Sequence, residues 1–147
     1  MTFATDSLPE KIYQTSQVRE LDQIAIQDMG ITGYELMCRA GEAACDVLRL
    51  RWPSTRAIQI FCGAGNNAGD GYVVARLALK QGYEVVVSAV VAPEKLSGDA
   101  ERAYADYRDS GGKVETLKVA TSAFSADLII DALLGVGFGR ELEGLFK

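Results

Sequence analysis

The chain has 147 residues, of which 48% are hydrophobic and 24% charged, a composition typical of one soluble globular domain. It carries 15 basic and 20 acidic residues, and the net charge of -5 argues against a surface that binds nucleic acid. The sequence has no histidine, which excludes histidine-based catalytic triads, histidine-ligated zinc and a histidine general base within this chain.

The cysteines and the hydrophobic runs restrict the class of protein further. Cys38, Cys45 and Cys62 lack the spacing of a metal or redox motif, and we expect them to be small buried apolar residues in a reducing compartment. Residues 1–11 do not resemble a secretory signal, and the apolar run at 85–92 is too short to span a membrane. We therefore expect a cytoplasmic protein with neither a membrane nor a nucleic-acid partner.

The N-terminal part predicts a polar arm followed by two helices. Residues 1–15 form the expected arm, and Ser16 is expected to cap the first helix, which runs to residue 28. Thr32 and Glu35 form a capping-box signature at the start of the second helix, which runs to residue 51. The second helix carries an apolar stripe on one face: Leu36, Ala40, Ala43, Ala44 and Val47.

Strands and helices then alternate along the chain. The predicted strands are residues 57–62, 83–91, 113–119 and 127–131. The predicted helices between them are residues 72–81 and 97–110. Such alternation indicates an α/β fold with a doubly wound parallel sheet and helices on both of its faces. Right-handed crossovers then predict the spatial order third, second, first, fourth strand.

Glycine-rich loops follow the first and the fourth strand, at residues 63–71 and 132–140. These two strands are neighbours in the predicted sheet and flank the point where the strand order reverses. Ligands of doubly wound sheets bind at that point, beyond the carboxyl ends of the strands. The two loops are therefore the expected ligand site.

The first loop matches the dinucleotide fingerprint at Gly63, Gly65 and Ala68, and the N-terminus of a following helix can bind an anion. A classical NAD site also needs an acidic residue at the end of the next strand, to hold the ribose. Residues 88–91 contain none, which disfavours an NAD(P)-dependent oxidoreductase. The loop also lacks the lysine of an ATP-hydrolysing P-loop.

Three polar positions in these loops have alternative interpretations. Asn66 and Asn67 can offer side-chain oxygens to a hard cation or a ligand, or they can simply adopt left-handed turn geometry. Asp70 is most simply the cap of a helix that starts near Gly71. Asp131 ends an apolar strand, and its carboxylate needs either a cation or backbone N–H groups of its own loop. Both interpretations of Asp131 remain open at this point.

These motifs resemble those of one family. Residues 63–71, GAGNNAGDG, resemble the GxGNNGGDG loop of the NAD(P)H-hydrate epimerase family (YjeF N-terminal domain-like), and residues 131–137, DALLGVG, resemble its motif Asp-x-Leu/Phe-x-Gly-x-Gly. Residues 29–31 and 35–41 are similar to the family's N-terminal helices. The resemblance covers residues 16–147 and implies a Rossmann-like three-layer α/β/α sandwich with a mostly parallel sheet, preceded by two helices. The family's downstream motif Asp-x-Pro-Ser-Gly is absent, so we expect a domain truncated on its C-terminal side.

The resemblance also implies a function. Family members interconvert the R and S epimers of hydrated NADH and NADPH as homodimers, without a redox step, and many are fused to an ADP- or ATP-dependent dehydratase, which here would be a fused or a separate partner. By resemblance, Asn67 and Asp131 ligate a potassium ion, and Asp131 also acts in proton transfer. The substrate-binding residues that the resemblance implies are Asn66, Asn67, Ala68, Gly69, Asp70, Gly135, Val136, Gly137, Phe138, Gly139, Arg140 and Glu141.

One residue departs from the family pattern inside the loop. Ala68 stands where the family has glycine, and we expect backbone strain there if the position needs a positive φ. The alternative function is a non-catalytic dimerisation or scaffold module of the same fold, as in eukaryotic RNA-decapping enhancers. An NAD(P)-dependent oxidoreductase is less favoured. The two N-terminal helices are candidates for the dimer face because they carry apolar stripes.

Overall fold

The computed structural model describes residues 11–117, 125–136, 139 and 141. The chain divides into two compact units, residues 1–31 and 32–147. The first unit contains α1 (Thr15–Gln27). The second unit contains, in chain order, α2 (Gly33–Arg51), β1 (Ala57–Cys62), α3 (Asn66–Lys80), β2 (Glu84–Ala89), the 3₁₀ helix η2 (Pro93–Lys95), α4 (Gly98–Asp109), β3 (Lys113–Thr116) and β4 (Leu128–Ala132). None of the helices in the described ranges is both long and apolar enough to cross a membrane.

Helix α1 begins two residues earlier than a cap at Ser16 predicts. The backbone N–H of Gln14 donates to the side-chain oxygen of Gln17 at 2.8 Å, so the cap lies at Gln14 and the expected cap at Ser16 is wrong. Gly30 follows the helix with a φ of +68°, a conformation that glycine adopts without strain. No residue of α1 is buried.

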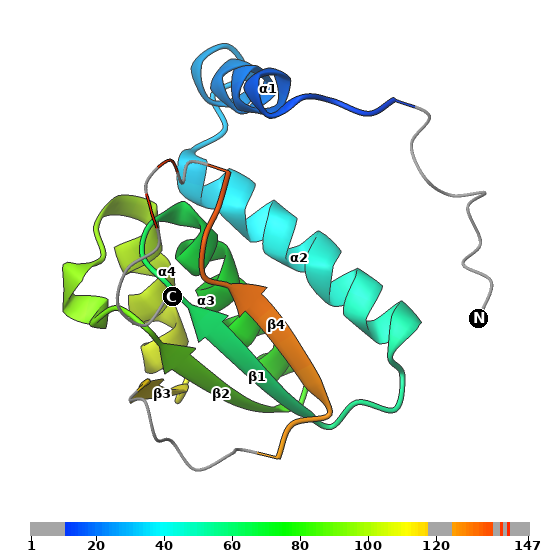
Figure 1. The fold of residues 1–147 in the computed structure, drawn as a ribbon. Coiled ribbons are helices and arrows are strands. Elements are labelled where there is room, and N and C mark those ends of the chain that lie inside the picture. The colour runs from blue at the N-terminus through cyan, green and yellow to red at the C-terminus, as the bar shows by residue number, and fades with distance from the viewer. Residues whose placement is uncertain (1–10, 118–124, 137–138, 140, 142–147) are drawn as a thin grey trace. The chain divides into compact units, whose positions relative to one another are not determined.

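The sheet of the second unit has the predicted strand order, β3-β2-β1-β4, and all of its neighbouring strands are parallel (Figure 1). Ile60 in β1 lies between Val87 of β2 and Ile130 of β4. The α/β class, the parallel sheet and the two preceding helices are therefore confirmed. The carboxyl ends of β1 and β4 lie side by side, as the site hypothesis requires.

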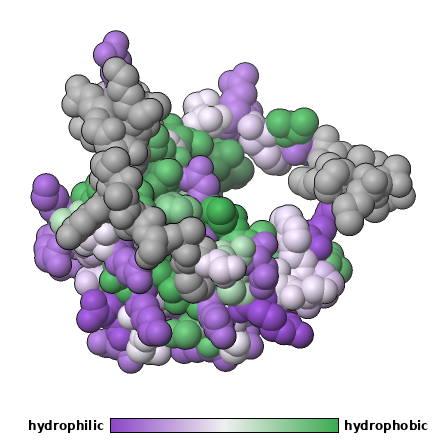
Figure 2. Space-filling model, turned by 60° about the horizontal axis from the view of Figure 1, so that its bottom comes forward, coloured by the Kyte–Doolittle hydropathy of each residue, from purple (hydrophilic) through white to green (hydrophobic). Residues whose placement is uncertain are grey.

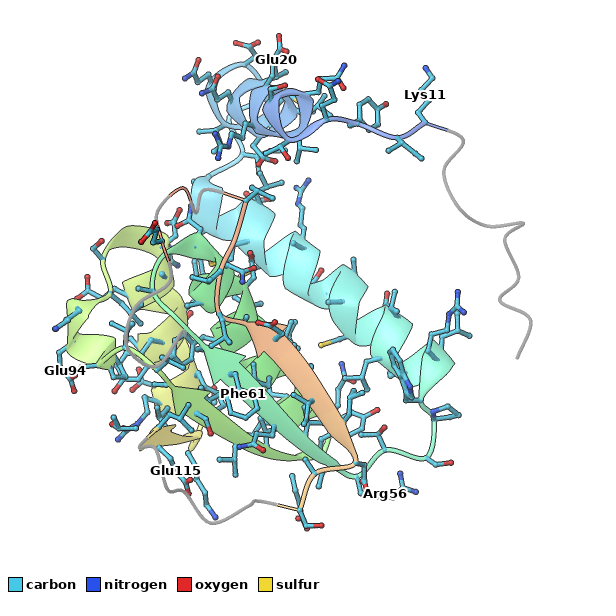
Figure 3. All side chains as sticks on the ribbon, viewed as in Figure 1. Lys11, Glu20, Arg56, Phe61, Glu94 and Glu115 are labelled. Carbon is cyan, nitrogen blue, oxygen red and sulfur yellow. The ribbon has the colours of Figure 1, made fainter. Side chains whose placement is uncertain are left out.

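The described helices of this unit pack on one face of the sheet, where α3 contacts β1, β2 and β4 and lies between α2 and α4 (Figure 1). The residues of β1 on that face are fully buried: Ile58, Ile60 and Cys62. The other face carries the alternate residues Gln59, Phe61, Ile129 and Asp131, and Phe61 can be found there in Figure 3. Ile129 is 62% exposed. The second helix layer of the expected sandwich is not among the described residues.

Helix α2 buries a different face from the stripe that the sequence analysis singled out. The buried residues of α2 are Tyr34, Met37, Gly41, Cys45 and Leu48. The predicted stripe Leu36, Ala40, Ala43, Ala44 and Val47 is exposed, apart from half-buried Leu36. The capping signature is confirmed in part, because the Thr32 hydroxyl accepts the Glu35 N–H at 3.1 Å while the Glu35 carboxylate accepts from Arg39.

Asp127 holds the start of β1 beside the start of β4. Its Oδ2 accepts the backbone N–H groups of Arg56 at 2.8 Å and Ala57 at 2.9 Å. These two hydrogen bonds stabilise the charged form and lower the pKa of the Asp127 carboxyl below its ordinary value of 3.8. The carboxylate therefore joins two strands whose residues are 70 positions apart.

We expect the variant Asp127→Ala to melt at a lower temperature than the wild type at neutral pH. Because the folded-state pKa lies below 3.8, the contribution of the carboxylate is present above that pH and is lost as the pH falls through the folded-state value. Thermal melts of both proteins from pH 7 to pH 2 test this. A gap in melting temperature that stays constant over the whole range would contradict the assignment.

Candidate functional site

The site is built first on the N-terminus of α3, which starts at Asn66 and not near residue 72 as predicted. Gly65 precedes the helix with a φ of +88°, which only glycine adopts readily. The first helical hydrogen bond of this turn runs from the Gly69 N–H to the Gly65 carbonyl at 3.1 Å. The amides of the turn's earlier residues therefore point out of the helix end, as in anion-binding helix N-termini.

Three expectations for this segment are corrected by the early helix start. Asp70 is the fifth residue of α3, so it is not the N-cap of a helix at Gly71. The described part of the chain has no non-glycine residue with a positive φ, so Asn66 and Asn67 are helical and not left-handed. Ala68 is helical and fully buried, and the expected strain at this position is absent. Local signals failed here because tertiary packing of small residues overrode the turn preference of asparagine and glycine.

We expect Ala68→Gly, which restores the family's residue, to destabilise the protein by about 1–2 kcal/mol. Glycine costs about 1 kcal/mol in a helix interior and the buried methyl group contributes about 0.8 kcal/mol. Urea unfolding measures the difference, and Ala64→Gly, at an exposed position before the helix, is the matched control. If Ala68→Gly proves more stable than the wild type, alanine is strained at this position after all.

The second glycine loop lies directly against the first. The Gly63 N–H donates to the Ala132 carbonyl at 3.1 Å. A Cβ atom added to Gly63 would lie 2.0 Å from the Leu133 carbonyl oxygen, and one added to Gly135 would lie 3.1 Å from the Asn67 Cβ. The half-buried Asn67 side chain is thus in contact with the loop that follows β4. The two glycine loops are therefore in contact at the carboxyl ends of β1 and β4.

Asp131 is the fourth residue of β4 and lies on the sheet face away from α3. It is exposed, and its Oδ1 accepts the Leu133 N–H at 2.9 Å. This hydrogen bond agrees with the interpretation in which backbone N–H groups of its own loop satisfy the Asp131 carboxylate. A carboxylate has further acceptor positions, so this hydrogen bond is compatible with a cation at the other oxygen. In the described ranges no three histidine, cysteine, aspartate or glutamate side chains gather as a metal site.

The other predicted site residues have different environments. Asn66 is exposed, whereas Ala68 and Gly69 are buried. Neither Ala68 nor Gly69 has a polar side chain, so each can offer a ligand only its backbone. Asp70 and Gly135 are half-buried, and Val136 is 69% exposed. Gly139 and Glu141 are exposed. The predicted residues that lie outside the described part of the chain are Gly137, Phe138 and Arg140.

Cys62, at the end of β1, packs under the first turn of α3 on the core side. Its thiol is fully buried and lies 3.8 Å from the Ala68 carbonyl oxygen, to which it donates. Burial raises the pKa of the Cys62 thiol to about 12, so the group is a neutral thiol at physiological pH. The prediction that Cys62 is a packing residue is confirmed, and its contact with Ala68 shows which turn it supports.

An apolar hollow of about 410 Å³ lies between α2, α3 and β4. Its lining residues are Ala44, Val47, Leu48, Trp52, Val74, Leu128, Ile129, Ile130 and Asp131. Asp131 alone among these carries a charge. Figure 2 shows hydrophobic residues gathered at the surface between hydrophilic ones on the face that it presents. The sequence patterns gave no signal for this hollow, because it joins helix and strand residues far apart in the chain.

The sequence of this chain matches a known protein family. The family described as YjeF-related protein N-terminus matches this chain over residues 33–147. The chain belongs to that family. The YjeF-related match includes both glycine loops and every predicted site residue.

Curated relatives of this YjeF-related chain carry repair-enzyme names. The bifunctional NAD(P)H-hydrate repair enzyme Nnr of Coxiella burnetii is 42% identical over 132 residues, which cover 90% of this chain and 27% of the relative. The NAD(P)H-hydrate epimerase of Rhodobacter capsulatus is 38% identical over 141 residues, which cover 91% of this chain and 66% of the relative. This chain thus spans about a quarter of the first relative and nearly two thirds of the second.

The fold is also found in a solved structure. The crystal structure of yeast ynu0 (YNL200c) superposes with a TM-score of 0.80 at 21% sequence identity, covering 92% of this chain and 61% of the yeast chain. This similarity shows that the YjeF-related chain shares the yeast protein's fold.

Proposed function

We propose that this chain is an NAD(P)H-hydrate epimerase domain that interconverts the R and S epimers of hydrated NADH and NADPH. The observation that carries the proposal is the contact between the two glycine loops, in which Asn67 on α3 lies against Gly135 after β4. The relatives named as NAD(P)H-hydrate epimerases and repair enzymes support the choice of substrate.

The first turn of α3 binds the anionic part of the substrate in this proposal. Hydrated NADH and NADPH carry a diphosphate, and the outward amides and positive dipole end of a helix N-terminus favour such a group. Asn66 is exposed beside this turn and offers a side-chain donor and acceptor. The buried residues Ala68 and Gly69 pack this turn against the core.

Asn67 and Asp131 hold a potassium ion in this proposal. An amide oxygen and a carboxylate oxygen are ligands that hard cations prefer, and the donor set contains no sulfur or imidazole that would favour a transition metal. The ion supplies positive charge beside the bound substrate. Asp131 is also the proposed catalytic residue, and its role is proton transfer during epimerisation.

The proposed biological setting follows the sequence analysis. The protein acts in the cytoplasm as a homodimer and supplies one epimer to an ADP- or ATP-dependent dehydratase, either fused or separate. The word bifunctional in the name of the Coxiella burnetii relative supports a fused form in that protein.

A direct assay tests the proposal. The purified R epimer of hydrated NADH is incubated with the protein in potassium buffer or in potassium-free buffer, and the S epimer is followed by chromatography. We expect equilibration faster than the spontaneous rate, and a slower reaction without potassium. A rate equal to the spontaneous one would instead favour the scaffold alternative.

A further inference from the structure

A side-chain cluster outside the glycine loops joins α2 to α4. The hydroxyl of Tyr34, the second residue of α2, donates to the Oδ2 atom of Asp106 on α4. The guanidinium carbon of Arg102, one turn earlier on α4, lies 4.0 Å from the centroid of the Tyr34 ring. Tyr34 is 8% exposed, and burial raises the pKa of its phenol, so the hydroxyl stays protonated and donates at physiological pH. The proposed reaction assigns no role to this cluster.

Tyr34 fixes the N-terminal end of α2 against a second helix. Two other polar contacts at this end are local, because Thr32 accepts the Glu35 N–H and Glu35 pairs with Arg39 within α2. The partner of Tyr34 lies 72 positions later in the chain, on the helix at the other side of α3 (Figure 1). The hydrogen bond therefore bridges the two helices that flank α3.

The same two helices enclose the first turns of α3. Met37 lies one turn after Tyr34 on α2 and is buried. A Cβ atom added to Gly69 would lie 2.6 Å from the Met37 Cε, 2.7 Å from its Sδ and 3.0 Å from the Ala100 Cα on α4. Gly69 is therefore held between α2 and α4, and its N–H donates to the Gly65 carbonyl at 3.1 Å. The separation of α2 and α4 thus sets the position of this turn.

We infer that Tyr34 is a positioning residue for the ligand-binding turn of α3, acting through Met37 on Gly69. This role rests on the proposed function, in which the outward amides of the turn bind the diphosphate of the substrate. Hydrogen bonds weaken steeply when the donor angle or the distance departs from its optimum, and misplacement by about 1 Å is enough to slow an enzyme. Tyr34 offers the substrate no contact in this role, because its hydroxyl donates to Asp106.

The kinetics of Tyr34→Phe test this role. The variant removes only the hydroxyl and keeps the ring against Arg102. With the R epimer of hydrated NADH as substrate, we expect KM to rise by about fivefold and kcat to stay within about twofold of the wild-type value. The reason for this difference is that the turn binds the substrate in the proposal, while Asp131 transfers the proton. An unchanged KM, or a kcat that falls as much as KM rises, overturns the inference.

Tyr107→Phe is the matched control. Tyr107 is also a buried tyrosine, and its hydroxyl donates to the Lys113 carbonyl at 3.1 Å. Lys113 is the first residue of β3, so this hydrogen bond lies at the opposite end of the parallel sheet from the glycine loops. The control should lose stability to a similar extent and keep KM within about twofold of the wild-type value. An equal rise of KM in both variants would mean that any loss of stability weakens binding, which overturns the inference.

Variants of Asp106 test whether the pair acts as a unit. Asp106→Asn keeps a side-chain oxygen that can accept the Tyr34 hydroxyl, so its KM should stay within about twofold of the wild-type value, whereas Asp106→Ala should match Tyr34→Phe. Combining Tyr34→Phe with Asp106→Ala should raise KM no further, because either change removes the same hydrogen bond. A double variant in which the two losses multiply contradicts the inference.

Met37→Val tests the route to the turn. Valine lacks the Sδ and Cε atoms that lie over Gly69 but keeps a buried apolar side chain on α2. Its KM should rise as in Tyr34→Phe, and adding Tyr34→Phe to it should change KM by less than about twofold. A further rise of about fivefold in the combined variant would show that Tyr34 does not act through Met37.

Hydrogen exchange of the Gly69 amide provides a readout that needs no activity. Without substrate, this amide should exchange about fivefold faster in Tyr34→Phe than in Tyr107→Phe, because only the former loosens the turn locally. Equal exchange in the two variants overturns the inference. A wild-type chain without epimerase activity would instead refute the proposed function, while faster Gly69 exchange in Tyr34→Phe would still support the positioning of the turn.

Discussion

Asp131→Asn should lower the rate of epimerisation by about 10²–10⁴-fold while the protein stays folded. Asparagine has nearly the same shape, and its side-chain oxygen can still accept the Leu133 N–H that Asp131 accepts at 2.9 Å. The loop after β4 therefore keeps its anchor, and the variant loses the charge and the proton acceptor. The rate is measured from the conversion of the R to the S epimer, with a thermal melt on the same preparation.

The exchange Asp127→Asn provides a matched control for this result. Asp127 directly precedes β4, whereas Asp131 lies near the end of that strand. The Asp127 carboxylate accepts the backbone N–H groups of Arg56 and Ala57 at the start of β1. The control should change stability and leave the rate of the folded protein near the wild-type value. A normal epimerisation rate in Asp131→Asn would remove the catalytic role of this carboxylate and leave it as the anchor of its loop.

Gly63→Ala should produce the largest loss of stability among single substitutions near the site. The added Cβ would lie 2.0 Å from the Leu133 carbonyl oxygen, and this neighbour is backbone, which cannot rotate away. Such overpacking costs about 3 kcal/mol, which corresponds to a drop in melting temperature of roughly 6–12 °C for a domain of this size. Separation of the two glycine loops should also abolish epimerisation.

Gly139→Ala is the matched control for this substitution. Among the described residues no atom lies within 4 Å of a Cβ added to Gly139, so the stability of this variant should stay within about 0.5 kcal/mol of the wild type. Guanidinium unfolding compares the two variants under the same conditions. Equal stability of Gly63→Ala and the wild type would show that the loops are not in close contact in solution.

The sheet topology could be predicted from the sequence because its signals are local and mutually consistent. Residues 57–62 form a short run of β-favouring residues, and the strand has the predicted bounds in the structure. Alternating helices then leave few arrangements with right-handed crossovers, and the order β3-β2-β1-β4 is one of them. The end of β2 was less predictable, because the apolar run continues to residue 92 after the pairing with β1 stops at Ala89.

The start of α3 could not be predicted, because asparagine and glycine favour turns in isolation. The helix extends to Asn66 because its first turns are packed from several sides: Gly69 lies against Met37 of α2 and Ala100 of α4. These contacts involve residues more than 30 positions away. The sequence therefore predicted which residues form the candidate site. It did not predict that residues 66–71 are helical.

Two further features depend on contacts between distant residues. The buried residues of α2 and its exposed stripe both have helical spacing, and only the position of α3 decides that Met37 and Cys45 face inward while Val47 does not. The partners of the Asp127 carboxylate are backbone amides about 70 positions earlier, which no spacing rule reveals. Nothing in the side-chain types of these residues distinguishes the observed arrangement from its alternatives.

The pairing of β1 with β4 also determines when the candidate site can form as the chain folds. The paired residues of β1 and β2 are 27 positions apart, as in Ala57 and Glu84, whereas those of β1 and β4 are 70 positions apart, as in Ile58 and Leu128. Closing that longer connection costs more chain entropy, and such non-local pairings form late. In a ribosome-bound chain that has emerged only as far as α4, β1 can pair with β2 but not with β4. The candidate site between the loops after β1 and β4 is then still absent. Strand β4 thus completes both the sheet of the described residues and the candidate site.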